Sequence, residues 1–328
     1  MHEGTTRAVG VVGTALWLLL CASSPLKSQE ASSLVGHKDA IFGLAFGPDS
    51  ATLASASADQ TAILWDLGRK RPRVTFARHE ATVYAVAVSP DGKMIASAGG
   101  DMKIRLWDSV SGKERRVLRG DKNAVYCVVF SLDGKMLASA CADGTVRLWE
   151  AETGREQAAL RGHRGPVHGL AFSKDGKVLV SSGADTTLHV WDVATGAKRL
   201  VLKRHNGEAY RIALSPDGKR VASASADKSV ILWDSDSWQP ATTIQGQPST
   251  VYCAAYSPDG KILASAGERG VLRLWDIGSA QQLRQLAGKQ EALYAVLFSP
   301  NGKLLAAAGE GEAIRLWETS TLASNSGK

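Results

Sequence analysis

ARHEATVYAVAVSPDGKMIASAGGDMKIRLWDSVSGKERRVL, residues 77–118, is the stretch that decides the fold, because variants of it recur along most of the 328-residue chain. The recurrence is easiest to follow in a set of tryptophans that stand 42 residues apart: Trp65, Trp107, Trp149, Trp191, Trp233, Trp275 and Trp317. A fixed period of about 40–45 residues is typical of supersecondary units that bury their apolar faces against one another. The sequence therefore predicts one repeated architecture and not two unrelated domains.

Each copy contains four short segments with the composition of β-strands. In the quoted copy they are 83–89, 93–98, 103–107 and 115–118, which are rich in β-branched and small residues and are separated by turns. The first turn is Ser-Pro-Asp-Gly, with proline and glycine where a tight turn needs them. A small sheet that is apolar on both faces cannot bury them alone, so we expect the copies to pack face to face in a ring.

The register also predicts how the ring closes. The fourth strand of six copies is marked by an apolar residue at intervals of 42 residues: Phe76, Leu118, Leu160, Leu202, Ile244 and Leu286. One period before Phe76 is Leu34, and nothing after Trp317 has a strand pattern. We therefore expect the segment around Leu34 to supply the fourth strand of the last sheet, and residues 319–328 to form a flexible tail.

Residues 1–24 differ from the copies. A short polar stretch precedes the apolar run Ala8–Cys21, and small residues follow it, which is the order of a secretory signal peptide. The run of about fourteen residues is short for a membrane span, which needs about twenty. We expect cleavage near Ser23, a linker over 25–33 and an extracytoplasmic location, periplasmic or secreted. The alternatives are a membrane anchor, uncleaved or lipidated, and a nuclear or cytosolic scaffold if this segment does not direct export.

Composition limits the partners and the chemistry of the cysteines. The formal net charge is +7 and no block of like charges occurs, so we expect no nucleic-acid partner. Four cysteines, of which one lies in the leader, do not make a disulfide framework. Cys127 and Cys141 fall on neighbouring strands, but a three-residue turn would place Cys127 opposite Ser139. We therefore expect buried, reduced thiols.

Three motifs carry a resemblance to a known family. They are Gly-His at 36–37 and 162–163, Ser-Pro-Asp-Gly-Lys at 89–93, 215–219 and 257–261, and Leu-Trp-Asp at 64–66, 106–108, 232–234 and 274–276. Over residues 34–318 the chain resembles the WD40 repeats of seven-bladed β-propellers. The resemblance implies an all-β fold of seven four-stranded antiparallel blades, closed by the N-terminal strand that completes the last blade.

In that family a histidine, a serine or threonine, an aspartate and the tryptophan form a hydrogen-bonded chain, here called a tetrad, that fixes each blade. An indole N–H can only donate, and a serine hydroxyl can accept. The resemblance implies four complete tetrads, with these members: His37, Ser55, Asp59 and Trp65; His79, Ser97, Asp101 and Trp107; His163, Ser181, Asp185 and Trp191; His205, Ser223, Asp227 and Trp233.

Three repeats depart from the tetrad pattern. Asp121 stands at the histidine position of the third repeat. The sixth has Gln247 and Arg269 at the histidine and aspartate positions, and the seventh has Lys289, Ala307 and Gly311 at the histidine, serine and aspartate positions. We therefore expect the sixth and seventh blades to be the least rigid and to exchange their amide hydrogens fastest.

The repeated histidine, serine and aspartate do not indicate a hydrolase. A catalytic triad occurs once, at one geometry, whereas these sets follow the blade period. His168 and His189, the other histidines outside the leader, have no partner at metal-ligand spacing in the sequence. We predict no enzymatic activity, no catalytic residue, no metal site and no cofactor.

A second periodic position lies early in the first strand of every copy. It is always aromatic or imidazole: Phe42, Tyr84, Tyr126, His168, Tyr210, Tyr252 and Tyr294. In the family the matching position lies at a bulge on the upper mouth of the channel, where partners bind. The neighbouring positions are mostly small, but Glu208, Glu268 and Glu310 would favour a basic partner. Exposed tyrosines are amphipathic anchors of the kind enriched at binding hot spots.

Strict alternation from Val86 and Val88 allows another interpretation, in which Tyr84 and its counterparts pack between blades as core. Both interpretations of the aromatic positions stay open at this point. The sequence predicts a non-catalytic scaffold that binds a protein or peptide at a propeller mouth with an aromatic ring. It acts as a monomer or as a subunit of a hetero-complex. The alternative is an exported propeller enzyme or small-ligand binder at the channel mouth. An enzyme should show one asymmetric cluster of ionisable residues in the channel, whereas the register predicts near-uniform rings.

Overall fold

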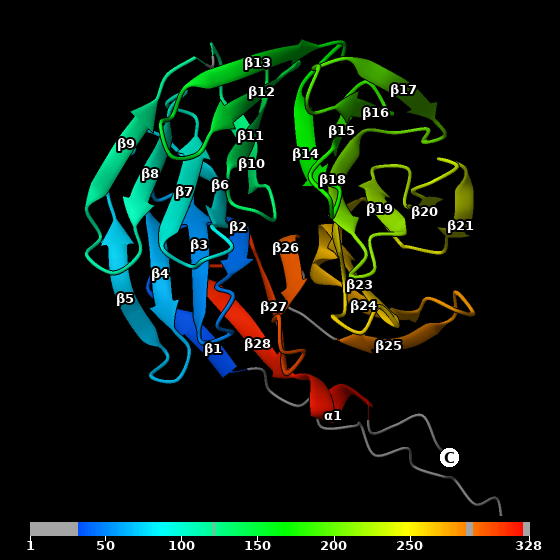
Figure 1. The fold of residues 1–328 in the computed structure, drawn as a ribbon. Helices are drawn as coiled ribbons and strands as arrows, with labels where there is room; N and C mark the ends of the chain where they lie inside the picture. Colours follow the sequence, from blue (N-terminus) through cyan, green and yellow to red (C-terminus); the bar gives the residue numbers. More distant parts are fainter. Residues whose placement is uncertain (1–31, 121, 287–290, 324–328) are drawn as a thin grey trace, which may run out of the picture.

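The computed structural model describes residues 32–323, except residues 121 and 287–290. These residues form seven four-stranded antiparallel sheets, arranged as blades around a central channel (Figure 1). In each blade the first strand lies at the channel and the fourth at the outer rim, where Figure 1 shows β9, β13 and β17. The predicted all-β, seven-bladed propeller is confirmed.

The blades follow one another along the chain. The strands of blades 1 to 3 are β2 (Ile41–Phe46), β3 (Thr52–Ser57), β4 (Ala62–Asp66) and β5 (Arg71–Phe76); β6 (Val83–Val88), β7 (Met94–Gly99), β8 (Ile104–Asp108) and β9 (Glu114–Leu118); β10 (Val125–Phe130), β11 (Met136–Cys141), β12 (Thr145–Glu150) and β13 (Glu156–Arg161). Those of blades 4 and 5 are β14 (Val167–Phe172), β15 (Val178–Gly183), β16 (Thr187–Asp192) and β17 (Lys198–Lys203); β18 (Ala209–Leu214), β19 (Arg220–Ser225), β20 (Val230–Asp234) and β21 (Pro240–Ile244). Those of blades 6 and 7 are β22 (Val251–Tyr256), β23 (Ile262–Gly267), β24 (Leu272–Asp276) and β25 (Gln282–Leu286); β26 (Leu293–Phe298), β27 (Leu304–Gly309), β28 (Ala313–Glu318) and β1 (Ser32–Val35).

The chain ends meet in blade 7, as the register predicts. Strand β1 pairs antiparallel with β28, and Leu34 lies opposite Ile314. Figure 1 shows the N-terminal β1 in blue beside β28 in red. Closure therefore includes backbone hydrogen bonds between the two ends of the propeller and not side-chain packing alone.

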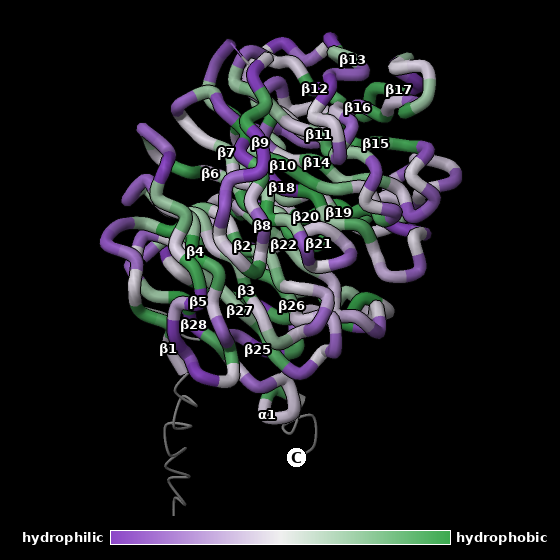
Figure 2. Tube along the Cα trace, turned by 60° about the vertical axis from the view of Figure 1, so that its left-hand side comes forward, coloured by the Kyte–Doolittle hydropathy of each residue, from purple (hydrophilic) through white to green (hydrophobic). Residues whose placement is uncertain are grey.

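The hydrophobic core is divided into clusters between neighbouring blades. Between blades 1 and 2, Leu64 and Phe76 pack with Val83, Ile95 and Trp107, and the rings of Phe76 and Trp107 lie 5.0 Å apart. Burying side chains of this size contributes about 1.5–3 kcal/mol each. Figure 2 shows the hydrophobic residues along the strands and the hydrophilic ones mainly in the loops and at the outer edge. Each blade thus covers the apolar face of the next.

A β-bulge interrupts the first strand of every blade, and it corrects one prediction. In blade 3 the bulge at Tyr126 adds a residue to β10, so Cys127 lies opposite Ala140 and not opposite Ser139. No disulfide joins the cysteines that the structure describes, and all three are buried. Burial raises the pKa of the Cys253 thiol to about 12.

The ends of the chain are described only in part. The expected signal peptide lies outside the described residues, and β1 begins at Ser32, within the segment expected as a linker. Helix α1 (Thr319–Ala323) follows β28 directly, and Arg284 Nη1 donates to the carbonyl oxygens of Thr321 at 2.9 Å and Leu322 at 3.2 Å. Residues 324–328 lie outside the described part. Across the residues the structure covers, no helix is long and apolar enough to span a membrane.

Candidate functional site

Hydrogen-bonded tetrads fix four of the blades. In blade 1, His37 Nδ1 donates to Asp59 at 2.8 Å, and the Ser55 hydroxyl lies 2.7 Å from His37 Nε2. Trp65 Nε1 donates to the same hydroxyl at 2.7 Å. This pattern suits a neutral imidazole, with Nδ1 protonated and Nε2 accepting from Ser55. Burial lowers the pKa of His37, against the opposing effect of Asp59, and so favours the neutral form.

Blades 2, 4 and 5 repeat the arrangement. Their histidine–aspartate distances are 3.0, 3.0 and 2.7 Å, and their histidine–serine distances are 2.7, 2.8 and 2.7 Å. The tryptophan N–H donates to the serine at 2.7, 2.8 and 2.9 Å. The four serines are 0% exposed and already serve two partners each. They cannot reach a substrate in this state, so the tetrads belong to the framework.

Blade 6 keeps more of the tetrad hydrogen bonds than the sequence predicts. Gln247 Nε2 donates to Ser265 Oγ at 2.8 Å, in place of the histidine, and Trp275 donates to the same oxygen at 2.8 Å. Blade 7 lacks the tetrad hydrogen bonds, because Ala307 has no hydroxyl. None of the described residues accepts a hydrogen bond from the Trp317 indole. In blade 3, Trp149 donates to Ser139 at 3.0 Å. The variant positions 121 and 289 lie outside the described residues.

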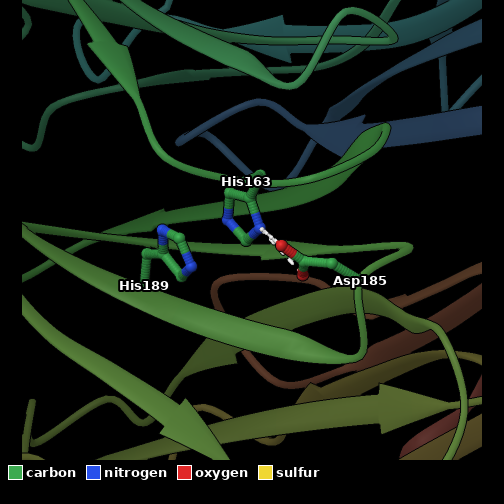
Figure 3. Close-up of side chains that lie close together, drawn as sticks. All are labelled: His163, Asp185 and His189. Atoms are coloured by element: carbon green, nitrogen blue, oxygen red, sulfur yellow. Dashed lines mark hydrogen bonds and ion pairs between the residues drawn. The ribbon is translucent and has the colours of Figure 1, made fainter.

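His189 is not isolated, as the sequence suggested, but lies against the tetrad of blade 4 (Figure 3). Its ring stacks on His163 with centroids 3.8 Å apart and planes inclined by 11°. Together with Asp185 the two histidines offer three possible metal-ligand atoms within 4.8 Å of one another. Sequence spacing does not reveal this neighbour, because β16 and the loop before β14 bring the two rings together only in the folded blade.

The geometry of this cluster does not suit an ion. An imidazole nitrogen binds a metal in the plane of its ring, and two nearly parallel planes do not share such a point. Both His163 nitrogens are also engaged, by Asp185 at 3.0 Å and Ser181 at 2.8 Å. Burial, and then the nearby His163 and Lys198, lower the pKa of His189 to about 4. The pair is a neutral stack inside the blade framework.

The aromatic positions of the seven inner strands meet at the upper mouth, which is the end of the channel where these strands begin. Each ring contacts both neighbours, with centroids 4.9–5.6 Å apart, so the seven close a circle that we call the aromatic ring. All seven are half-buried. They line a pocket of about 230 Å³ together with Arg211.

The bulges explain this placement. At each aromatic position the pairing of the first and second strands shifts, as between Val83 and Ala85 around Tyr84. The bulged residue leaves the alternation of the strand and is re-aimed. The described interblade clusters contain none of the seven side chains. The structure thus places them around the mouth and against one another, not between the blades.

Three exposed carboxylates stand beside one half of the aromatic ring. Glu310 accepts from the backbone N–H of Ala292 at 3.0 Å and from the Tyr294 hydroxyl at 3.4 Å. Burial, and then the charge of Glu310, raise the pKa of Tyr294 to about 12. Glu208 Oε2 lies 3.5 Å from His168 Nε2, an ion-pair distance too long for a good hydrogen bond. Glu268 lies in the short 3₁₀ helix η1 (Glu268–Gly270) that follows β23. Tyr294 therefore stays a neutral hydroxyl donor at physiological pH.

Arg211 is the functional candidate that the sequence analysis missed. The other six residues directly after an aromatic position are small: Gly43, Ala85, Cys127, Gly169, Cys253 and Ala295. At Arg211 the first strand departs further from the regular pairing, because β18 skips two residues, from Ala209 to Ile212, where the other first strands skip one. Arg211 Nη2 donates to the carbonyl oxygen of Phe42 at 2.9 Å. The signal was one large cation in a register of small residues.

Arg211 separates two cavities. It borders the upper pocket and also an apolar cavity of about 540 Å³ below it, and among the described residues it alone lines both. With His168 and Glu208 it makes the channel electrostatically uneven at blades 4 and 5. The near-uniform rings of ionisable residues that the register predicted are therefore wrong at this place.

Comparison with known proteins gives two findings. The family model described as WD domain, G-beta repeat matches seven segments: residues 28–66, 70–108, 112–150, 154–192, 196–234, 238–276 and 280–318. Protein Notchless from Drosophila melanogaster is 50% identical over 44 residues, which are 13% of this chain and 9% of that protein. The second match thus covers about one repeat and a small part of the relative.

Proposed function

This chain belongs to the WD40 repeat family, and on that premise we propose that it is a non-catalytic scaffold that binds a protein or peptide at its upper mouth. Propellers of this family typically mediate protein–protein interaction and are generally not catalytic. The observation that carries the proposal is the closed aromatic ring around a pocket of about 230 Å³. Tyrosine supplies contact area and a hydroxyl at little cost in side-chain entropy.

The charges of the mouth support a partner with a basic part. Glu208, Glu268 and Glu310 are exposed and lie on blades 5 to 7, so one half of the mouth is acidic although the whole chain carries a net charge of +7. Complementary charges speed association and fix the orientation of a partner. A lysine or arginine side chain of the partner would lie over this half.

The test is capture of partners by the intact propeller and by the double variant Tyr84→Ala, Tyr252→Ala. These two tyrosines lie on opposite sides of the mouth, in blades 2 and 6. The matched control is Leu132→Ala, because Leu132 is 57% exposed and borders the lower cavity. We expect proteins retained by the wild type and by Leu132→Ala to be lost from the double variant, with a cooperative unfolding transition in all three. Equal retention by the double variant, or loss in Leu132→Ala alone, would place the binding site elsewhere.

A second candidate function, binding of a small ligand at the channel mouth by an exported propeller, is favoured by one observation. Arg211, His168 and Glu208 gather ionisable groups on one side of the channel, as a small polar ligand would require. Native mass spectrometry of the purified propeller distinguishes the two candidates. A bound small molecule that Tyr84→Ala releases supports this candidate. A propeller that carries no small molecule but binds a protein partner argues against it.

We also propose that the propeller acts outside the cytoplasm, on the strength of the apolar run Ala8–Cys21 and the small residues after it. Fusion of residues 1–33 to a reporter that is active only after export tests this. Export with cleavage near Ser23 supports a secreted or periplasmic propeller, export without cleavage supports a membrane anchor, and a reporter retained in the cytoplasm overturns the proposal.

A further inference from the structure

Arg211 lies between the upper pocket and the cavity below it and lines both. Arg211 comes from blade 5, and its guanidinium reaches the Phe42 carbonyl of blade 1 at 2.9 Å, across the channel. Its positive charge is also felt in blades 3 and 6, where it opposes the rise in pKa that burial gives the thiols of Cys127 and Cys253. The guanidinium therefore lies near the channel axis, beneath the aromatic ring.

This guanidinium has unused donors. It carries five N–H groups, of which one is engaged by Phe42, and within the described part of the chain no carboxylate forms an ion pair with it. The cavity below it is lined mainly by small and apolar residues of the inner strands, and the upper pocket adds the tyrosines and His168. A cation held in such surroundings attracts an anionic group that can accept two hydrogen bonds side by side.

The shape of the pocket limits what such an anion can belong to. The aromatic ring forms the wall and Arg211 forms the floor, so an extended peptide cannot run through the channel at this point. A pocket of about 230 Å³ has room for the end of a chain. The end that a guanidinium favours is the carboxyl terminus, because the amino terminus is a cation.

Building on the upper-mouth function proposed above, we propose that Arg211 is a carboxylate anchor and that the partner enters the aromatic ring end-on, through its free C-terminal carboxylate. The last side chain then packs on the tyrosine faces, and residues before it cross the acidic half of the mouth. The carboxylate forms charge-assisted hydrogen bonds to the free donors of Arg211, with no covalent change.

The test uses two pools of N-acetylated hexapeptides, randomised at every position, one with free C-terminal carboxylates and one with C-terminal amides. Each pool is passed over immobilised wild-type propeller, and retained peptides are counted by mass spectrometry. We expect the carboxylate pool to be retained at least tenfold more strongly. Arg211→Met should abolish this preference and Arg211→Lys should keep part of it. Arg164→Met, which removes one exposed arginine from the loop before β14 on the same face, should leave it unchanged.

Each other result overturns the inference. Equal retention of the two pools, with loss of both in Tyr84→Ala, would leave the upper-mouth function standing without a carboxylate anchor. Enrichment of peptides with internal aspartate or glutamate in the amide pool would assign Arg211 to a side chain instead. Retention of neither pool would remove this inference together with peptide binding at the mouth. A preference that survives in Arg211→Met places the anchor elsewhere, and the comparison of the two pools on wild-type protein holds even if that variant does not fold.

Discussion

Blades 2 and 7 are built on the same repeat but are held together differently. In blade 2 the Ser97 hydroxyl links His79 to Trp107, and in blade 7 Ala307 stands at the serine position, so the Trp317 indole has no acceptor among the described residues. Both blades nevertheless place a tyrosine in the aromatic ring. The ring is thus present where the tetrad is absent, which indicates that the two features serve different purposes: the tetrad stabilises a blade, and the ring forms the mouth.

The largest expected effect separates these two blades directly. Ser97→Ala removes the partner of both the Trp107 N–H and the His79 imidazole, which are buried, and each orphaned group costs about 1–3 kcal/mol. We expect the free energy of unfolding to fall by about 2–6 kcal/mol, the sum for the two groups. The reciprocal change, Ala307→Ser, gives the Trp317 N–H an acceptor and should change the free energy of unfolding by about 1 kcal/mol or less. Chemical denaturation measures both, and equal losses in the two blades would contradict the comparison.

The second effect is a dependence of stability on pH that we expect in blade 4, which contains His163 and His189, and not in blade 7, which has no histidine. The pKa of His189 is lowered to about 4 in the folded protein, from an ordinary value of 6.5. The unfolded chain therefore binds more protons between these values, and stability is complete above about pH 6.5 and lost as the pH falls toward about 4. The pKa values of His37, His163 and His205 are lowered as well, with the same sign.

Hydrogen exchange resolved by blade measures this dependence. On acidification from pH 7 to pH 5, protection of β15 and β16, corrected for the intrinsic pH dependence of exchange, should fall more than protection of β27 and β28. His189→Gln should reduce the difference, because it removes the group that takes up the proton. Equal loss of protection in blades 4 and 7 would count against the explanation.

The smallest effect concerns the blade that lies between these extremes. Blade 6 retains a substitute for the tetrad histidine, since Gln247 donates to Ser265 at 2.8 Å. Gln247→Ala should lower the free energy of unfolding by about 1 kcal/mol and raise the exchange rate of β23 and β24 toward that of blade 7. An exchange rate in wild-type blade 6 that already equals that of blade 7 would show that the glutamine does not replace the histidine.

Much of this architecture could be predicted from the sequence because it is periodic. The 42-residue spacing defines the blades, and the position of Leu34 one period before Phe76 defines the closure. The four tetrads were implied by the resemblance to WD40 repeats, whose histidine, serine, aspartate and tryptophan recur at matching positions in four copies. The same register indicated the positions of the aromatic ring, although it could not decide between the mouth and the interblade core.

What the sequence did not reveal depends on contacts between residues that the repeat does not relate. The hydrogen bond of Arg211 joins it to Phe42, 169 residues away, and requires the closed ring. The stack of His189 on His163 requires β16 to lie against the loop before β14. The partner of Cys127 was wrong by one residue because a bulge adds a residue that a count of turn lengths does not include. Arg211 and His189 are single departures from the repeat, whereas the bulge recurs in every blade.

The aromatic ring, we propose, forms a contact surface and holds the blades together less than the interblade core does. The free energies of unfolding of Tyr84→Ala and Trp107→Ala, two variants of blade 2, test this most directly. Tyr84 is half-buried and contacts two neighbouring rings, each contact being worth about 0.5–1.5 kcal/mol. Truncation of a buried tryptophan costs about 3–5 kcal/mol. We expect Tyr84→Ala to unfold in one cooperative transition and to lose clearly less free energy of unfolding than Trp107→Ala. A loss in Tyr84→Ala as large as that in Trp107→Ala, or failure of the tyrosine variant to fold, would show that the ring is core and would contradict the account.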